Sequence, residues 1–190
     1  EGVWNPRLIP EDLWGERALV LGFGRIGRRI GEALRAIGME VTGLVRTLRP
    51  DPDFPLATAA ELPALLPDAR LLVLAAPSTP ATRSLLDAGL LARGSGKLLL
   101  VNVGRGDLVA PQALLAALDA GTLGHAVLDV FPEEPLPPES PLWRHPGVTV
   151  TPHHSGPSTP RAMVPDLLPN LRRFAEGLPI QDAVDRERGY

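Results

Sequence analysis

The chain has 190 residues, enough for one domain with a substantial core but too few for a two-domain enzyme of ordinary size. Its residues are 44% hydrophobic and 22% charged, with a formal net charge of −3, a composition typical of a soluble globular protein and without the basic excess that nucleic-acid binding needs. The lack of cysteine excludes disulfides, thiolate metal sites and cysteine nucleophiles. The N-terminal stretch lacks the cationic start and apolar core of a signal peptide, so we expect a cytoplasmic protein that binds no nucleic acid, membrane or metal.

The first part of the chain predicts a linker, a strand and a helix. Residues 1–16 are rich in turn-forming residues and precede the first strand as a linker would. An apolar run at 18–21 predicts a buried strand, and the apolar spacing across 25–37 predicts an amphipathic helix.

Three glycines, Gly22, Gly24 and Gly27, lie between that strand and that helix. A dinucleotide site requires this spacing, because Gly22 permits a tight turn, Gly24 lets the backbone approach a pyrophosphate, and Gly27 lets the helix pack closely on the strand. The N-terminus of the helix would hold the phosphates, since its N–H groups lack acceptors and its dipole favours an anion. The alternative is a glycine-rich turn that binds nothing.

Strands and helices alternate along the rest of the chain. Strands are predicted at 40–45, 71–76, 98–103, 125–130 and from 148, with helices at 58–66, 87–92 and 111–120. Strands this apolar, without polar alternation, are typical of a parallel sheet covered by helices on both faces. The predicted fold class is therefore α/β: a doubly wound parallel sheet of Rossmann type in three layers, with six strands in the order 3-2-1-4-5-6 across residues 17–156.

A last helix is predicted from Arg161 to Gly177. Its apolar residues gather on one side and need a covering partner: Met163, Leu167, Leu168, Leu171 and Phe174. We therefore separate residues 157–190, a C-terminal helix and tail, from the dinucleotide-binding domain.

Polar residues gather where the predicted strands end, at Arg46, Ser78, Thr82, Arg105, Asp129 and His153. Open α/β sheets bind their ligands in the crevice at this carboxyl edge of the strands. The sequence therefore predicts one crevice lined by these residues.

Arg105, Glu134 and His153 form a chemical set. Reduction of a keto acid by a nicotinamide hydride needs a cation to hold the carboxylate and polarise the carbonyl, and an acid to protonate the developing alkoxide. Arginine suits the first task and histidine the second, while Glu134 beside His153 would favour the imidazolium. Taken singly, each residue can also be a surface arginine, an acidic loop residue or a strand cap. His154 is expected on the other side of an extended chain and receives no catalytic role.

Five motifs in order make the chain similar to the nucleotide-binding half of the D-isomer-specific 2-hydroxyacid dehydrogenases: GFGRIG, PSTPATRSLL, NVGRGDLV, LDVFPEEPL and TPHHSG. The resemblance implies that Arg105, Glu134 and His153 are catalytic and that the residue matching Asp129 contacts the nicotinamide amide. It implies an oxidoreductase acting on CH–OH, which moves a hydride between NAD(P)H and a small 2-keto or 2-hydroxy acid. Glyoxylate and hydroxypyruvate reductases are the first branch to consider, and a homodimer is expected.

The cofactor-binding positions implied by these motifs run along the predicted strand ends. They are Gly22, Phe23, Gly24, Arg25, Ile26, Gly27, Arg46, Thr47, Pro77, Thr82, Val103, Gly104, Asp129 and Ser155. The family also carries a substrate domain, most of which precedes the first glycine motif. We therefore expect this chain to be a fragment that turns over poorly alone, with residues 157–190 returning to the missing domain.

The end of the second strand carries the prediction of cofactor preference. An acidic residue there holds the NAD ribose and repels a 2′-phosphate, but this chain has Val45 followed by Arg46 and Thr47. A cation and a hydroxyl can receive a phosphate dianion, so NADP is predicted as the preferred cofactor over NAD. In the alternative, Arg46 points into solvent, or Asp51 or Asp53 folds back toward the ribose.

Two other functions compete with the enzyme. A dinucleotide-sensing corepressor would share these motifs without significant turnover, but the chain has no basic patch or interaction tail. A methyltransferase could use a similar glycine turn, but its chemistry would not require the arginine, glutamate and histidine set.

Overall fold

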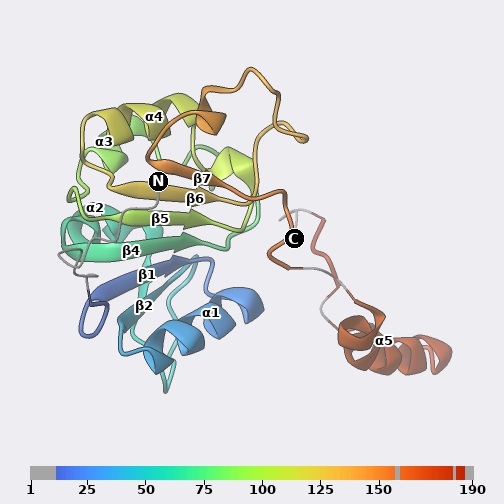
Figure 1. Cartoon of the computed structure of the whole chain (residues 1–190). Helices are drawn as coiled ribbons and strands as arrows, with labels where there is room; N and C mark the ends of the chain where they lie inside the picture. Colours follow the sequence, from blue (N-terminus) through green and yellow to red (C-terminus); the bar gives the residue numbers. More distant parts are fainter. Residues whose placement is uncertain (1–11, 157–158, 182, 187–190) are drawn as a thin grey trace, which may run out of the picture.

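The computed structural model describes residues 12–156, 159–181 and 183–186. Its body is a parallel sheet in the order β3-β2-β1-β4-β5-β6-β7 (Figure 1). The strands are β1 (Arg17–Leu21), β2 (Glu40–Val45), β3 (Leu56–Thr58), β4 (Ala69–Leu74), β5 (Leu99–Asn102), β6 (His125–Leu128) and β7 (Val148–Val150). The α-helices are α1 (Arg25–Ala36), α2 (Leu62–Leu65), α3 (Ala88–Leu91), α4 (Pro111–Asp119) and α5 (Pro160–Ala175). The predicted α/β fold class is confirmed.

The strand order differs from the prediction at one place. The apolar run at 71–76 was expected as the third strand, beyond β2, but it forms β4 and pairs with β1 on its other side. The strand next to β2 is instead β3. It was not predicted, because a strand of three residues after a proline-rich loop has no periodic pattern. The described sheet therefore has seven strands, and its topological switch point lies between β1 and β4.

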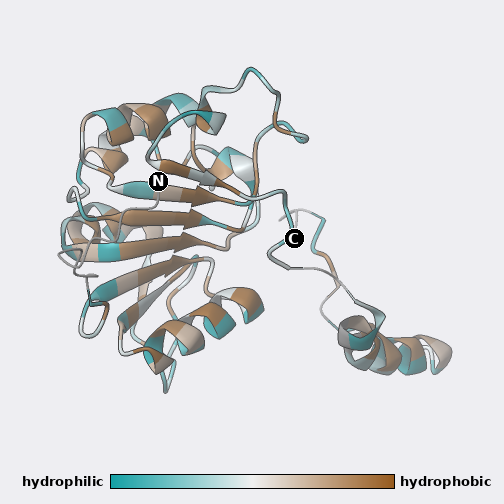
Figure 2. Ribbon diagram, viewed as in Figure 1, coloured by the Kyte–Doolittle hydropathy of each residue, from teal (hydrophilic) through white to brown (hydrophobic). Residues whose placement is uncertain are grey.

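Two apolar clusters flank the sheet and make three layers. On one face, α1 packs on Val20, Val41 and Val73 of the central strands. On the other face, α2, α3 and α4 contribute Leu62, Leu91 and Leu114 to the larger cluster. The strands are hydrophobic along most of their length, as Figure 2 shows, which is why they are stable only between layers of helices.

The predicted helix at 58–66 is broken into short segments. Thr58 and Glu61 form a capping box, with the Thr58 N–H donating to Glu61 Oε2 over 2.8 Å, as expected of a helix start. Pro63 and Pro67 then divide the stretch into a 3₁₀ turn at Ala59–Glu61, α2, and a second 3₁₀ turn at Leu66–Asp68. Further 3₁₀ turns of the same length occur at Gly106–Leu108 and Pro141–Trp143.

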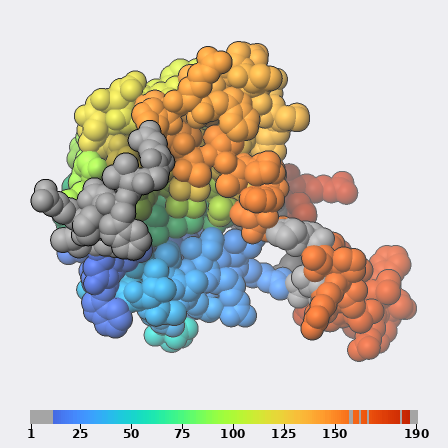
Figure 3. Space-filling view, in the orientation of Figure 1, coloured from blue at the N-terminus to red at the C-terminus, as the bar shows by residue number. Residues whose placement is uncertain are grey.

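Helix α5 stands apart from the body of the molecule (Figures 1 and 3). It keeps its helical form despite Pro165 and Pro169, and its apolar side is exposed, with Phe174 at 74%. The tail folds back on the helix, since the Gln181 N–H donates to Asn170 Oδ1 over 2.7 Å. Among the described helices, none is both long and apolar enough to cross a membrane.

Phe23 fills a space that two glycines leave open beneath α1. A Cβ at Gly31 would lie 2.8 Å from Phe23 Cε2, and one at Gly43 would overlap the Phe23 ring. The ring is buried and meets Phe54 edge-on, with ring centroids 5.0 Å apart. This aromatic pair joins α1 to the segment that follows β2.

We predict that Gly43→Ala lowers the free energy of unfolding by about 2 kcal/mol, because the added methyl group overpacks a closely filled core. Urea unfolding measures the change. Gly89→Ala in α3 is the control, since its Cβ would meet only Asp87 Oδ1, at 3.5 Å. Equal stabilities of the Gly43 variant and the wild type would contradict the packing described here.

Candidate functional site

The turn after β1 needs glycine for backbone reasons. Gly22 has φ +88°, and a Cβ on it would lie 2.5 Å from Ala76 Cα. A Cβ on Gly27 would overlap the carbonyl oxygen of Gly22, so α1 could not begin so close to β1. The turn therefore brings the helix N-terminus directly over the carboxyl ends of the central strands.

Gly24 caps α1 and leaves room for an anion. It provides no side-chain cap, the first turn of α1 has no acidic residue, and a Cβ on Gly24 would meet nothing within 4 Å. Arg25 and Ile26, the next two residues, are exposed. Because the first-turn N–H groups lack acceptors within the helix, this opening fits the pyrophosphate of a dinucleotide.

Phe23 belongs to the core and not to a cofactor surface. Besides its buried ring, its N–H donates to the Leu44 carbonyl over 3.2 Å and its carbonyl accepts from Arg49 over 3.1 Å. These contacts occupy the groups with which Phe23 could have held a ligand. The role of Phe23 in cofactor binding therefore stays an expectation from the motif, and its buried ring does not support it.

Beyond β2, the chain presents basic and hydroxyl groups. Val45 is buried at the strand end, and Arg46 and Thr47 follow it in exposed positions. Asp51 and Asp53, which could have turned toward a ribose, both form ion pairs with Arg28 of α1. The acidic side chains of this segment are therefore directed to the flank of the helix.

The loops after β4 and β5 meet the glycine turn at Ala76. A Cβ on Gly104 would lie 2.7 Å from the Ala76 carbonyl oxygen, as one on Gly22 would meet the Ala76 Cα. The Val103 N–H donates to the Leu74 carbonyl over 3.0 Å. Ala76 is thus shared by the turn after β1 and the loop after β5.

Thr82 gives the loop after β4 its shape. Its hydroxyl donates to the Pro77 carbonyl over 2.7 Å and accepts the Thr79 N–H over 2.8 Å. Farther along, Ser78 and Arg83 both contact Asp107 Oδ2, at 2.6 and 3.2 Å. These bonds hold the loops after β4 and β5 together.

Arg105 stands at the edge of the sheet on a fixed backbone. Asn102, buried at the end of β5, accepts the Gly104 N–H at 3.1 Å and donates to the Arg105 carbonyl at 2.9 Å. Gly106 lies so close to the Phe131 main chain that a Cβ would overlap it. Asn102 was not among the predicted site residues, although a polar residue at the end of an apolar strand is a signal visible in the sequence.

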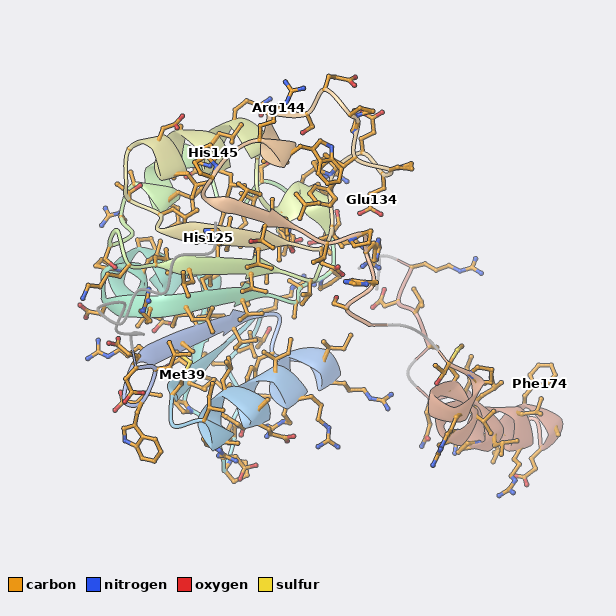
Figure 4. All side chains as sticks on the ribbon, in the orientation of Figure 1. Met39, His125, Glu134, Arg144, His145 and Phe174 are labelled. Atoms are coloured by element: carbon orange, nitrogen blue, oxygen red, sulfur yellow. The ribbon has the colours of Figure 1, made fainter. Side chains whose placement is uncertain are left out.

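Glu134 and His153 form a pair. Glu134 Oε1 accepts the Phe131 N–H over 2.9 Å, and Oε2 lies 2.7 Å from His153 Nδ1 (Figure 4 labels Glu134). The bond from His153, the Phe131 N–H and the charge of Arg105 hold the pKa of Glu134 below its usual range. Because an ionised carboxylate can only accept, Nδ1 carries a proton and Nε2 is left for a ligand.

Asp129 organises the loop that carries His153. Its carboxylate is 2% exposed and accepts from the hydroxyls of Thr151 and Ser155, both at 2.6 Å, and from the N–H groups of His154 and Ser155. Burial raises the pKa of Asp129, but these bonds outweigh burial and hold it far below its usual range. Asp129 and Ser155, expected to contact the cofactor, are therefore bonded to each other.

The bonds to Asp129 also explain the backbone of His153. This residue has φ +49°, a backbone conformation that costs energy for any residue other than glycine. The chain is therefore not extended here, and His154 is oriented by the bond from its N–H to Asp129 Oδ1 at 3.1 Å. Among the described residues, no three His, Asp or Glu side chains gather as a metal site would require.

The chain is similar to known proteins in sequence and in structure. Residues 1–155 match the family model described as D-isomer specific 2-hydroxyacid dehydrogenase, NAD binding domain. Glyoxylate/hydroxypyruvate reductase A of Klebsiella pneumoniae (strain 342) is 35% identical over 189 residues, which are 98% of this chain and 60% of that protein. The chain therefore spans about 60% of the length of such curated relatives.

Two solved structures are similar over nearly the whole chain. The D-isomer specific 2-hydroxyacid dehydrogenase of Xanthobacter autotrophicus Py2, in complex with NADPH and MES, has a TM-score of 0.91 and 37% identity, covering 100% of this chain and 78% of its own. The NADPH-dependent glyoxylate/hydroxypyruvate reductase of Sinorhizobium meliloti, in complex with NADP and sulfate, has a TM-score of 0.88 and 36% identity, covering 98% and 60%.

We predict that Asp129→Asn destabilises the fold by about 2 kcal/mol at pH 7, because an amide cannot accept all the bonds that the carboxylate accepts. The pKa of Asp129 is lower in the folded than in the unfolded chain, so the carboxylate stabilises the fold at pH values above about 4 and loses this effect as the pH falls further.

In urea titrations at each pH, the difference in free energy of unfolding between wild type and variant should therefore stay constant from pH 7 to about 4 and decrease as the pH falls from about 4 to 3. Asp119→Asn is the control, since Asp119 is an exposed partner of His145 and its loss should cost well under 1 kcal/mol. A difference between wild type and Asp129→Asn that stays constant over the whole of this pH range would contradict the assigned role.

Proposed function

Because this chain belongs to the D-isomer-specific 2-hydroxyacid dehydrogenase family, matching its NAD-binding domain, we propose that it is the cofactor-binding part of a reductase of small 2-keto acids. Glyoxylate and hydroxypyruvate are the proposed substrates, as the names of the relatives suggest. The observation that carries the proposal is the bond between His153 Nδ1 and Glu134 Oε2, at the same edge of the sheet as the glycine turn.

The residues of this edge would divide the chemistry among them. A bound nicotinamide supplies the hydride. Arg105 would hold the substrate carboxylate and polarise the carbonyl, as a planar cation with several donors can do. His153 would deliver a proton from Nε2 to the developing alkoxide, while the ionised Glu134 on Nδ1 stabilises the imidazolium and orients the ring.

NADP is the proposed cofactor, with NAD as the weaker one. Gly24, Arg25, Ile26 and Gly27 would face the pyrophosphate through their main chain, and Pro77, Thr82, Val103 and Gly104 would line the nicotinamide side. Arg46 and Thr47 would hold the 2′-phosphate, supported by the absence of an acidic residue at the end of β2 and by the NADPH and NADP in the two similar structures.

Residues 157–190 are proposed as a second unit beside the dinucleotide-binding domain at 17–156. The exposed apolar side of α5 would pack on the portion of the relatives that this chain does not span. Association of two copies through their nucleotide-binding domains and a cytoplasmic location also stay proposals. The enzyme is preferred to a corepressor because the relatives are named as reductases.

In a form of the protein that reduces glyoxylate, we expect His153→Ala to lower kcat by about 100-fold or more, because the variant lacks the proton donor. Steady-state kinetics and NADPH titration test this, and the Kd for NADPH should stay within about twofold. His154→Ala, which removes a neighbouring exposed imidazole, serves as the control. An unchanged rate in His153→Ala would exclude His153 as the acid.

Arg46→Ala tests the choice of cofactor. We expect the wild type to bind NADPH at least about tenfold more tightly than NADH, equal to about 1.4 kcal/mol, as suits a partly exposed charge pair. The substitution should remove most of that preference with little change for NADH. Arg144→Ala, an exposed arginine before β7, is the matched control (Figure 4). Fluorescence titration would contradict the assignment if Arg46→Ala still favoured NADPH.

A further inference from the structure

An ion pair that no motif predicts fastens the segment after β2 to helix α1. Asp51, in the connection between β2 and β3, has a side chain only 3% exposed and forms an ion pair with Arg28 of α1. Its Oδ1 also accepts the N–H groups of Asp53 and Phe54, at 3.1 and 3.2 Å. A buried carboxylate is stable only when it is paired and bonded in this way, so the contact defines one position of the segment.

Further contacts surround this ion pair. Arg28 Cζ lies 5.6 Å from the centroid of the Phe23 ring and 5.5 Å from that of Phe54. Arg28 Nη1 also pairs with Asp53 Oδ2 at 3.2 Å. About two turns further along α1, Arg35 donates to the Asp53 carbonyl at 3.0 Å, and its Cζ lies 4.3 Å from the centroid of the Phe54 ring. We call the set of Arg28, Arg35, Asp51, Asp53 and Phe54 the latch.

The latch determines where the charges of the segment lie. Burial raises the pKa of Asp51, but the N–H groups of Asp53 and Phe54 and the charge of Arg28 hold it below its usual range, so the carboxylate stays ionised. Arg28 therefore neutralises negative charge that would repel a phosphate dianion if it turned toward the ribose. On the other side of the segment, Arg49 donates to the Phe23 carbonyl in the glycine turn at 3.1 Å.

Between the end of β2 and these anchors lie Leu48 and the two residues proposed to bind the 2′-phosphate, Arg46 and Thr47. They are joined to β2 on one side and to Arg49 and the latch on the other. A short chain held at both ends has few conformations left to lose when a ligand binds, and such preorganisation favours binding.

We propose that the Arg28–Asp51 ion pair is a specificity device, which positions Arg46 and Thr47 for a 2′-phosphate and keeps the carboxylates of Asp51 and Asp53 away from it. Arg28 and Asp51 would act as positioning residues, through their effect on Arg46 and Thr47. The proposal rests on the proposed preference for NADPH. If the latch were purely structural, it would stabilise the fold without affecting the preference for NADPH over NADH.

The experiment compares the Kd values of NADPH and NADH by fluorescence titration in wild type, Asp51→Asn and Arg28→Gln. Asn at position 51 keeps an oxygen to accept the N–H groups and removes only the charge. We expect the Kd for NADPH to rise at least fivefold and the Kd for NADH to stay within about twofold, so that a tenfold preference falls to about twofold.

Two further variants separate charge from folding. Arg28→Lys keeps a cation, so it should retain more of the NADPH preference than Arg28→Gln, and it keeps the test decisive if the Gln variant does not fold. Asp68→Asn is the matched control, because it breaks an exposed aspartate–arginine pair, with Arg17, at the opposite end of β1. It should leave both Kd values unchanged.

The outcomes distinguish this inference from the proposed function. If Arg46→Ala removes the preference but Asp51→Asn and Arg28→Gln keep it, or weaken both cofactors equally, the latch is structural only and the inference is overturned while the function stands. If the wild type binds both cofactors equally, the role of Arg46 and the proposed role of the latch in cofactor specificity are both contradicted. If the wild type binds neither, the proposed function fails.

Discussion

The main chains of the loops after β1, β4 and β5 are in close contact at Ala76, and the candidate site depends on this contact. Gly22, after β1, and Gly104, after β5, approach Ala76 so closely that neither could carry a Cβ. The contact lies at the switch point of the sheet, between the carboxyl ends of β1 and β4. Backbone packing thereby places the helix N-terminus at Gly24 and the residue Arg105 at the same edge of the sheet.

Two carboxylates organise the part of this edge that carries His153. Asp129 holds the loop after β7 through Thr151, His154 and Ser155, and this loop keeps His153 in a backbone conformation that it would not adopt alone. The carboxylate of Glu134 then fixes the imidazole. One carboxylate thus shapes the main chain and the other orients the side chain, which explains why two acidic residues accompany a single histidine.

The elements that sequence reasoning found are those whose signal is local. The glycine turn, the strand at 18–21 and the helix predicted at 111–120, which is α4, follow from spacing and from residues that start or stop helices. Strand β3 was not predicted, because three residues are too few to show a periodic pattern. Without β3, the run at 71–76 was placed beside β2, whereas it pairs with β1 as β4. The latch and the bonds of Asp129 join residues far apart along the chain, and no local pattern encodes such contacts.

Both outer strands of the sheet are three residues long, and this limits how copies of the protein can meet. β3 follows Pro55, and β7 is followed by Thr151 and Pro152, so each edge offers few main-chain groups for another strand to pair with. A continuous sheet running from one molecule to the next is therefore disfavoured. The same brevity protects a sheet of apolar parallel strands against fibrous aggregation during synthesis, when its edges are exposed to other chains.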